Sequence, residues 1–587
     1  MQMKNILGLA VLGSVIVSPA WASQPFHVAY PPANYQTNTD RIFVMGSAPA
    51  QGEVLINGKA IARSREGHFA PIFPLQPGEN RFTVRYQNQE VQLKVTRTLT
   101  RQPSPSLLEF GKDSLTPAVD VARLPNELIC FGAIAPSNAN VSVQLGGQNI
   151  PLMHQEQVVD LPPNSAALTQ KNQPQAVMGT GQYVGCAAAA AAADLGLPLF
   201  QLTRNNETVS QEGAGKVQIL SPANLEIAEV IVDAGVARTG PSTDYSRLTP
   251  LPKGTRASVT GREGEWVRLD YGGWINSKEI RTVKGTAPPL SMIRSVSARQ
   301  IPGATEVIFP LQAPVPMTVQ QGDRTLVLTL YNTTAQTDII RFNPNPVISR
   351  LDWQQVAPGM VQYTFNFKPQ QQWGYQLRYE GTSLVLTIRH PPSRNKLFGK
   401  PLSGIKILLD PGHGGEDSGA PGPTGYEEKE ATLYMAKLLA NQLIARGATV
   451  YLTRQEDKAV SLPDRVAMIN QVQPAIALSI HYNSLPDDGD VLNTQGFGTF
   501  WYNPQAHSLA AFLHNYIVEK GGRPSYGVFW DNLALTRPSS APSVLLELGF
   551  MSNPTEFEWV VNPQEQQKMA GAIANGITQW FAATQQN

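Results

Sequence analysis

The sequence has few cysteines and no excess of charge of either sign. Only Cys130 and Cys186 occur among 587 residues, which excludes a disulfide-rich scaffold and a cluster of thiolate metal ligands. A single bridge between them stays open, because pairing depends on their separation in space. The formal net charge is +1, so the strong positive field that attracts nucleic acid is missing, and we expect no nucleic-acid partner.

Long apolar runs are also missing beyond the N-terminus. Lys4 precedes an apolar run over residues 6–17, and Ala20-Trp21-Ala22 offers small residues for a cleavage site. The run is shorter than the roughly 20 residues that cross a bilayer, which disfavours a membrane anchor. We therefore predict a signal peptide over residues 1–22, export to the periplasm or cell envelope, and no transmembrane segment after cleavage.

Turn-forming residues, by contrast, are abundant: the chain contains 48 glycines and 47 prolines, beside 42% hydrophobic residues. This composition is typical of folded, β-rich modules with many turns. With a prior of about 150 residues per domain, the length predicts about four units. The fold class that we predict is multidomain, with N-terminal all-β modules (sandwiches and a small barrel) followed by a C-terminal α/β three-layer domain.

The first two units are predicted from short alternating runs between turns. Residues 24–100 are expected to form a β-sandwich module, with turns such as Asn57-Gly58. Residues 107–215 are expected to form a second β-rich module. An alanine run at residues 187–193 interrupts the strand pattern of this second module and indicates a short helix or a packed insert.

Two further β units resemble known bacterial modules. Residues 224–282, with stretches such as Glu265-Trp266-Val267-Arg268-Leu269, resemble the bacterial Src-homology-3-like barrel, which implies binding of cell-wall peptide or positioning of an enzyme. Residues 288–390, which end in Trp373-Gly374-Tyr375 and further alternating strands, resemble the amidase N-terminal targeting domain. That resemblance implies a β-sandwich that localises an enzyme on the envelope. Residues 391–404 are expected to be a linker.

The pattern changes at residue 405, where apolar strands begin to alternate with helical stretches. The candidate strands are residues 405–409, 448–453, 475–480 and 544–546, and the final helix is residues 566–581. Strand–helix–strand alternation predicts an α/β layered domain over residues 405–583.

Four residues of this domain stand out by position. His413 lies just after the first candidate strand and His481 follows the third, Glu547 ends the fourth, and Glu428 lies at the entrance to the first helix. The carboxyl edge of an open α/β sheet is where ligand sites form. Two imidazoles and one carboxylate make a three-ligand zinc site that keeps a position for water, whose pKa zinc lowers to about 7. A second carboxylate is then needed to move the proton of that water, so Glu428 and Glu547 could divide the two tasks.

Each of these residues has a plainer alternative. A single histidine is more often structural than a ligand, and His507 and His514 are interpreted as surface or packing residues of a polar helical stretch. Glu427 competes with Glu428 as a ligand. Glu547 is harder to dismiss, because burying an unpaired charge at the end of a strand is costly. The glycine-rich loop around the first histidine lacks the Gly-Lys-Ser/Thr that would make it a phosphate loop.

Four motifs in order resemble the zinc-dependent N-acetylmuramoyl-L-alanine amidase family. They are Asp410-Pro411-Gly412-His413-Gly414-Gly415 with Gly419-Ala420, then Glu428-Lys429, then Ser479-Ile480-His481-Tyr482-Asn483, and finally Leu546-Glu547-Leu548-Gly549-Phe550 with Ser552-Asn553. The resemblance implies that His413, Glu428 and His481 bind one Zn²⁺ ion and that Glu547 is the catalytic general base and acid. In the family the residue before the lysine is the ligand, which favours Glu428 over Glu427.

The resemblance also implies a reaction, the hydrolysis of the amide between N-acetylmuramic acid and L-alanine in peptidoglycan, for wall remodelling or cell separation. Peptidoglycan is then the substrate, and the β modules are candidates for contacts with envelope proteins. Arg465, Asn483 and Arg537 match recurrent family positions and are interpreted as structural or substrate-orienting. Only 14 residues separate His481 from Gly496. Some division amidases carry an extra helix in this region that blocks the metal, and its absence predicts an open site that needs no activator.

Two other classes of function compete with a wall amidase. An envelope scaffold protein with a degenerate hydrolase domain is disfavoured, because all four chemical residues are present. A zinc peptidase or deacetylase would share the metal chemistry but not the set of motifs. The sequence therefore favours the enzyme, subject to the geometry of the site.

Overall fold

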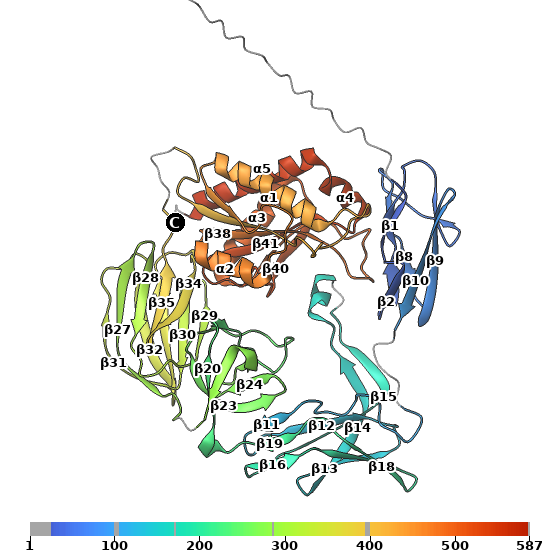
Figure 1. Cartoon of the computed structure of the whole chain (residues 1–587). Helices are drawn as coiled ribbons and strands as arrows, with labels where there is room; N and C mark the ends of the chain where they lie inside the picture. The colour runs from blue at the N-terminus through green and yellow to red at the C-terminus, as the bar shows by residue number, and fades with distance from the viewer. Residues whose placement is uncertain (1–24, 99–104, 170–171, 285–286, 394–398, 585–587) are drawn as a thin grey trace, which may run out of the picture.

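The computed structural model describes residues 25–98, 105–169, 172–284, 287–393 and 399–584. The predicted signal peptide, residues 1–22, lies outside these ranges. In the described part, β-sheet modules precede a C-terminal domain that holds all five α-helices, which confirms the predicted fold class (Figure 1). Over these ranges, no helix combines the length and the apolar character needed to cross a membrane.

The N-terminal module is built from small sheets around one apolar core. Its strands pair in the orders β1-β4-β7, β2-β10-β9-β5-β6 and β3-β8. Between β5 and β6, Asn57 and Gly58 have φ angles of 50° and 79°, the two positive values that a type I′ hairpin turn requires. The strands are β1 (His27–Tyr30), β2 (Asn34–Thr37), β3 (Arg41–Phe43), β4 (Met45–Ser47), β5 (Val54–Ile56), β6 (Lys59–Ala60), β7 (His68–Phe69), β8 (Ile72–Pro74), β9 (Gly78–Tyr86) and β10 (Gln89–Arg97).

The second module contains a six-stranded sheet in the order β12-β15-β14-β13-β17-β18. Cys130 on β12 and Cys186 on β15 lie opposite each other in the antiparallel register and form a disulfide, so the bridge that the sequence left open is present. The elements are β11 (Val121–Arg123), β12 (Ile129–Ile134), β13 (Asn140–Leu145), β14 (Gln148–Asp160), η1 (Asn164–Thr169), β15 (Gln175–Ala187), β16 (Ala193–Gly196), β17 (Leu199–Arg204), β18 (Glu207–Glu212) and β19 (Val217–Ile219). No helix forms over residues 187–193, all of which are described.

Strands β14 and β15 extend beyond this sheet as a two-stranded ribbon (Figure 1). The neighbouring strands β13 and β12 end beside Leu152 and Gln182, whereas β14 and β15 continue to pair as far as Asp160 and Gln175. The connecting helix η1 lies against the C-terminal domain, where the Tyr526 hydroxyl donates to the carbonyl of Leu168 at 3.0 Å.

The third β unit shares a sheet with the second module. One path runs β16-β19-β11-β23-β20-β26, so the sheet continues across the predicted boundary between residues 215 and 224. An ion pair between Arg268 and Glu127, at 2.6 Å, links the same two units. The elements are η2 (Pro222–Asn224), β20 (Ile227–Val230), β21 (Ala234–Gly235), β22 (Leu251–Pro252), β23 (Arg256–Glu263), β24 (Trp266–Leu269), β25 (Trp274–Asn276), η3 (Ser277–Glu279) and β26 (Ile280–Val283).

The fourth β unit is a sandwich of two sheets, in the orders β31-β27-β28-β35-β34 and β29-β30-β33-β32. Along β33, buried and half-buried residues alternate, as expected of a strand with one face on a core. The strands are β27 (Ser291–Ile301), β28 (Ala304–Phe309), β29 (Met317–Gln321), β30 (Thr325–Tyr331), β31 (Thr333–Arg341), β32 (Ile348–Ala357), β33 (Met360–Phe367), β34 (Tyr375–Glu380) and β35 (Ser383–Arg389).

The C-terminal domain is a six-stranded sheet with helices on both faces. The order is β37-β36-β38-β41-β39-β40, in which β37, β36, β38 and β41 are parallel and β39 runs antiparallel to β41. Helices α1, α3 and α5 share one apolar core with the sheet, and α2 packs on the opposite face. The elements are β36 (Lys406–Pro411), α1 (Glu428–Ala445), β37 (Thr449–Leu452), α2 (Leu462–Val472), β38 (Ile476–Asn483), β39 (Phe497–Trp501), α3 (Pro504–Gly521), β40 (Ser525–Trp530), β41 (Ser543–Phe550), α4 (Pro554–Val560) and α5 (Pro563–Thr584).

The N-terminal module packs against this domain at its carboxyl edge. Phe43 and Met45 share a buried apolar cluster with Leu485, Val491 and Phe550. In addition, the backbone N–H of Phe43 donates to the carbonyl of Asp487 at 3.2 Å, and the side chain of the same aspartate accepts from the Tyr30 hydroxyl. The loop that follows β38 is therefore held by the first module of the chain.

The disulfide predicts a local stability effect. The bridged cysteines are 56 residues apart, and closing a loop of that size typically contributes about 2–4 kcal/mol. The double variant Cys130→Ala/Cys186→Ala should therefore speed hydrogen exchange of the β12 and β15 amides by about two orders of magnitude. Mass spectrometry of peptides from these strands would measure the change, with peptides of α1 as the internal control. Unchanged exchange would contradict the prediction.

Candidate metal centre

The four residues singled out by the sequence lie at one edge of the C-terminal sheet. His413 follows β36, His481 lies near the end of β38, and Glu547 lies in β41. β38 and β41 pair in parallel, with His481 opposite Glu547, so these two residues are neighbours on the same face of the sheet. Glu428 is the first residue of α1. Parallel pairing thus brings together residues up to 134 positions apart in the sequence.

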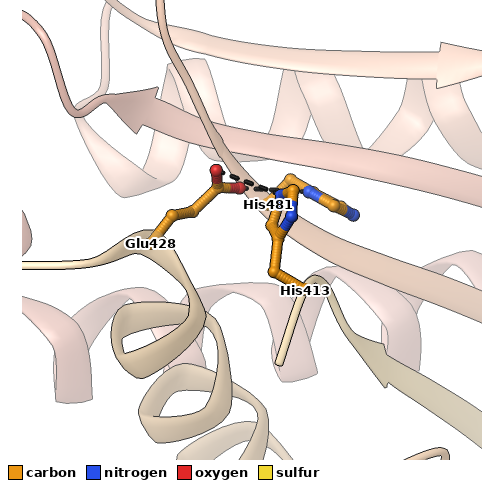
Figure 2. A group of neighbouring side chains, drawn as sticks. All are labelled: His413, Glu428 and His481. Atoms are coloured by element: carbon orange, nitrogen blue, oxygen red, sulfur yellow. Dashed lines mark hydrogen bonds and ion pairs between the residues drawn. The ribbon is translucent and has the colours of Figure 1, made fainter. Parts of the chain in front are cut away.

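Three of the four residues form a compact cluster (Figure 2). The Nε2 atom of His413 and the Nδ1 atom of His481 each lie 3.1 Å from a different carboxylate oxygen of Glu428. The two imidazole rings are 4.9 Å apart and nearly perpendicular. One ligand atom from each residue falls within 4.8 Å of the others, so the set could hold a metal ion.

The backbone around His413 is shaped for this close approach. His413 itself has a φ angle of 59°, in the left-handed region that residues other than glycine rarely adopt. A Cβ atom at Gly412 would lie 2.2 Å from the His481 ring, so only glycine allows the second imidazole to pack against this loop. The glycine-rich motif therefore brings the two histidines together.

Asp417, which the sequence reading did not single out, orients the His413 ring. Its carboxylate lies 2.9 Å from Nδ1 of His413. A carboxylate on one ring nitrogen fixes the tautomer and leaves the other nitrogen, here Nε2, to face the cluster. The only signal in the sequence is the spacing of four residues after the histidine.

The pKa values of Glu428 and Glu547 are shifted in opposite directions. Burial would raise the pKa of Glu428, but hydrogen bonds from His413 and His481 dominate and hold it below its usual range. Backbone N–H groups of Ala420 and Tyr482 also donate to this carboxylate. Glu428 is therefore ionised.

Glu547 behaves in the opposite way. Burial, and then the negative charge of Glu428, raise the pKa of Glu547 well above its usual range. Its Oε2 atom is buried and has no hydrogen-bond partner among the described residues. Since buried polar atoms are normally paired, a carboxyl group with an open oxygen beside a metal-binding cluster is suited to proton transfer.

The competing candidates lie outside the cluster. Glu427 precedes α1, is 41% exposed at its side chain and forms an ion pair with Lys429 at 3.1 Å. His507 packs on Trp501, with ring centroids 4.6 Å apart, and His514 contacts the Ser525 hydroxyl at 2.9 Å. The structure therefore places Glu428, and not its neighbour, beside the two histidines.

The other positions that match the family make backbone contacts. Arg465 donates to the carbonyl of His413 at 2.6 Å, Arg537 donates to the carbonyl of Asn532 at 2.8 Å, and the side chain of Asn483 accepts from the next backbone N–H. Residues 484–496, all of which are described, form turns without a helix.

Comparison with family models assigns two parts of the chain. Residues 407–579 match the model described as N-acetylmuramoyl-L-alanine amidase, and residues 235–281 match a bacterial SH3 domain. The C-terminal domain belongs to the N-acetylmuramoyl-L-alanine amidase family. The resemblance carried by the four motifs and by the third β unit is thereby confirmed, whereas the targeting domain expected over residues 288–390 stays a prediction.

Curated relatives are similar to about a third of this chain. A probable cell wall amidase, LytH, of Staphylococcus epidermidis is 37% identical over 194 residues, which cover 33% of this chain and 64% of the relative. Its counterpart in Staphylococcus aureus is 38% identical over 185 residues, 31% of this chain and 60% of the relative. The chain thus spans less than two thirds of these relatives.

One of the solved structures that match is the N-acetylmuramoyl-L-alanine amidase of Clostridium difficile 630. It is 29% identical, the match covers 30% of this chain and 97% of that chain, and the TM-score is 0.29.

The contact between Asp417 and His413 generates a prediction. Asp417→Ala removes the group that orients the ring, so the affinity for a divalent ion should fall about 10- to 100-fold. Titration with Zn²⁺ and with Co²⁺ against a chromophoric chelator would measure this. Glu416→Ala removes the same charge from the adjacent exposed position and is the matched control. Equal affinity in the two variants would contradict an orienting role for Asp417.

Proposed function

We propose that the chain is a zinc-dependent peptidoglycan hydrolase that cuts the amide between the lactyl group of N-acetylmuramic acid and L-alanine. The observation that carries the proposal is the cluster of two half-buried histidines and one buried glutamate, with Glu547 on the neighbouring strand opposite His481. It lies in the segment that matches the amidase family.

The donor set fits zinc. Two imidazole nitrogens and one carboxylate are the ligands of many catalytic zinc sites, which keep a further position for water or substrate. The ligands in this proposal are Nε2 of His413, Nδ1 of His481 and the carboxylate of Glu428. Zinc in this site would activate a water molecule and polarise the substrate carbonyl.

Glu547 supplies the proton transfers in this scheme. Its raised pKa and its open Oε2 atom suit a group that accepts a proton from water and passes it to the L-alanine nitrogen. The oxygen of water ends on the lactyl carboxyl, the carbon–nitrogen bond breaks, and the amine leaves with the proton that Glu547 donates. Glu428 stays ionised and does not exchange protons.

The remaining modules are proposed to determine where the enzyme acts. We infer that the chain is exported and acts in the periplasm or cell envelope, because a disulfide bridges the second module and disulfides persist in oxidising compartments. The bacterial SH3 domain is proposed to bind peptidoglycan peptide, and the sandwich over residues 288–390 to localise the enzyme. The N-terminal modules are the candidate surfaces for envelope protein partners.

Three glutamate variants test the assignment. Glu547→Gln should keep bound zinc but lower the release of muropeptide products from purified peptidoglycan by about a hundredfold to ten-thousandfold. Glu428→Gln should lose both zinc and activity, and Glu427→Gln, the matched neighbour, should keep both. Zinc content by atomic absorption and new L-alanine amino termini are the two readouts. Loss of zinc in Glu427→Gln, with retention in Glu428→Gln, would reverse the assignment.

Metal removal tests the reaction itself. A chelator should abolish the appearance of new L-alanine termini, and added Zn²⁺ should restore it, because water is activated only beside the metal. If the full chain binds the wall but releases no such termini with zinc supplied, the chain is a wall-binding scaffold protein and not an amidase.

A further inference from the structure

We propose that Arg454 and Arg465 are positioning residues that hold together the three chain segments carrying the metal ligands. This inference rests on the metal site in the proposed function. Both arginines are almost fully buried, with 1% and 3% of their surface exposed, behind the loop that contains His413. Neither side chain belongs to the ligand cluster, so their effect acts through other residues.

The first segment is the loop of His413. Three consecutive carbonyl groups, those of Pro411, Gly412 and His413, accept hydrogen bonds from the two guanidinium groups. Arg465 donates to the first and third at 2.7 and 2.6 Å, and Arg454 donates to the first and second at 3.1 and 2.8 Å. These bonds fix the peptide planes on both sides of the left-handed His413. A backbone conformation of this kind persists only where its surroundings enforce it.

The second segment is the start of α1. The same terminal nitrogen of Arg454 that binds the loop also donates to the carbonyl of Lys429 at 2.7 Å and to the Thr432 hydroxyl at 3.0 Å. Lys429 directly follows the ligand Glu428. One guanidinium group therefore spans the two segments that carry His413 and Glu428.

The third segment is β38, which carries His481. Arg465 forms a buried ion pair with Asp410 at 2.6 Å, and Asp410 also accepts from the hydroxyls of Thr453 and Ser479, each at 2.6 Å. Ser479 lies two residues before His481 on the same strand. Because every bond in this chain of contacts is buried, water does not compete for them, and the distance between the two histidine segments is fixed.

Lysine cannot replace either arginine in this role. A guanidinium group presents several N–H donors in one plane, whereas an ammonium group is a single point on a flexible stem. A lysine at position 465 could pair with Asp410, but its single nitrogen could not take the places of the three guanidinium nitrogens that bond Asp410 and the carbonyls of Pro411, His413 and Val460. The charge would be kept and the geometry lost.

Arg389 offers a matched control from the same chain. It is half-buried at the end of β35, and it likewise donates to three carbonyls, those of Gln473, Pro474 and Ser540, at 2.6–2.9 Å. These carbonyls precede β38 and β41, at the amino ends of the strands, whereas the ligand cluster lies at the carboxyl edge. A lysine there removes the same kind of contact without touching the ligand segments.

The experiment compares Arg465→Lys and Arg389→Lys in the full chain. Both should unfold at a lower temperature in the presence of a chelator, because each loses buried hydrogen bonds. Only Arg465→Lys should weaken the affinity for Zn²⁺, by about 10- to 100-fold, in competition with a chromophoric chelator. Ser479→Ala, which removes one bond to Asp410, should fold and show a smaller loss in the same direction, and it serves if Arg465→Lys does not fold.

The outcomes separate this inference from the proposed function. Zinc affinity within twofold of the unsubstituted chain in both Arg465→Lys and Ser479→Ala overturns the positioning role, as does an equal loss in Arg389→Lys. If the unsubstituted chain binds Zn²⁺ tightly but releases no L-alanine termini, the proposed reaction fails while the positioning role is still measured. If it binds no Zn²⁺, the metal site and the positioning role both fail.

Discussion

Parallel pairing of β36 with β38 and of β38 with β41 is the constraint on which the amidase domain depends. In a parallel sheet the carboxyl ends of the strands meet at one edge, so residues from three distant segments converge there. The register sets His481 opposite Glu547, and the helix after β36 begins with Glu428. A shift of one residue in the pairing of β38 with β41 would turn either His481 or Glu547 to the other face of the sheet.

The charged groups at this edge differ in how completely they are hydrogen-bonded. Behind the histidines, Asp410 and the two buried arginines are extensively hydrogen-bonded, and in front of them Glu428 is bonded to both imidazoles. Such groups are expensive to bury unless they are paired, and these are. Glu547 is the exception, with one oxygen that has no hydrogen-bond partner among the described residues. The charged groups that hold the site together thus have partners, whereas Glu547, which we propose as the proton-transfer group, keeps one oxygen without a hydrogen bond from the described residues.

The sequence allowed the clustering of His413, Glu428 and His481 to be predicted, because each lies near the end or at the start of a strongly patterned element. Strand ends and helix starts can be located from apolar runs, and parallel pairing then brings the carboxyl ends of the strands to the same edge of the sheet. Asp417 and Arg454 could not be found in this way. Their contacts depend on the conformation of the loop after β36, in which His413 has a left-handed backbone, and no apolar pattern predicts that conformation. The choice of Glu428 over Glu427 came from the family motif and not from periodicity.

Tertiary context also overrode local pattern in the β modules. The alanine run after β15 has high helix propensity, yet it lies at the end of a strand and forms no helix. The sheet shared by the second and third units joins β11 to β23, a pairing between residues about 140 positions apart that no local signal announces. Pairings of this kind depend on which edge strands still have unpaired backbone groups after each unit has folded.

The contact between the N-terminal module and the amidase domain has a consequence for how the chain is made. Tyr30 and Asp487 are 457 residues apart, and Phe43 and Met45 are synthesised long before Leu485 and Phe550. Domains fold largely in the order of synthesis, so the first module carries an uncovered apolar patch until the last domain is complete. Each of the two apolar surfaces is thus covered by the other, and an amidase domain separated from its first module would expose Leu485, Val491 and Phe550 beside the edge that carries the histidine cluster.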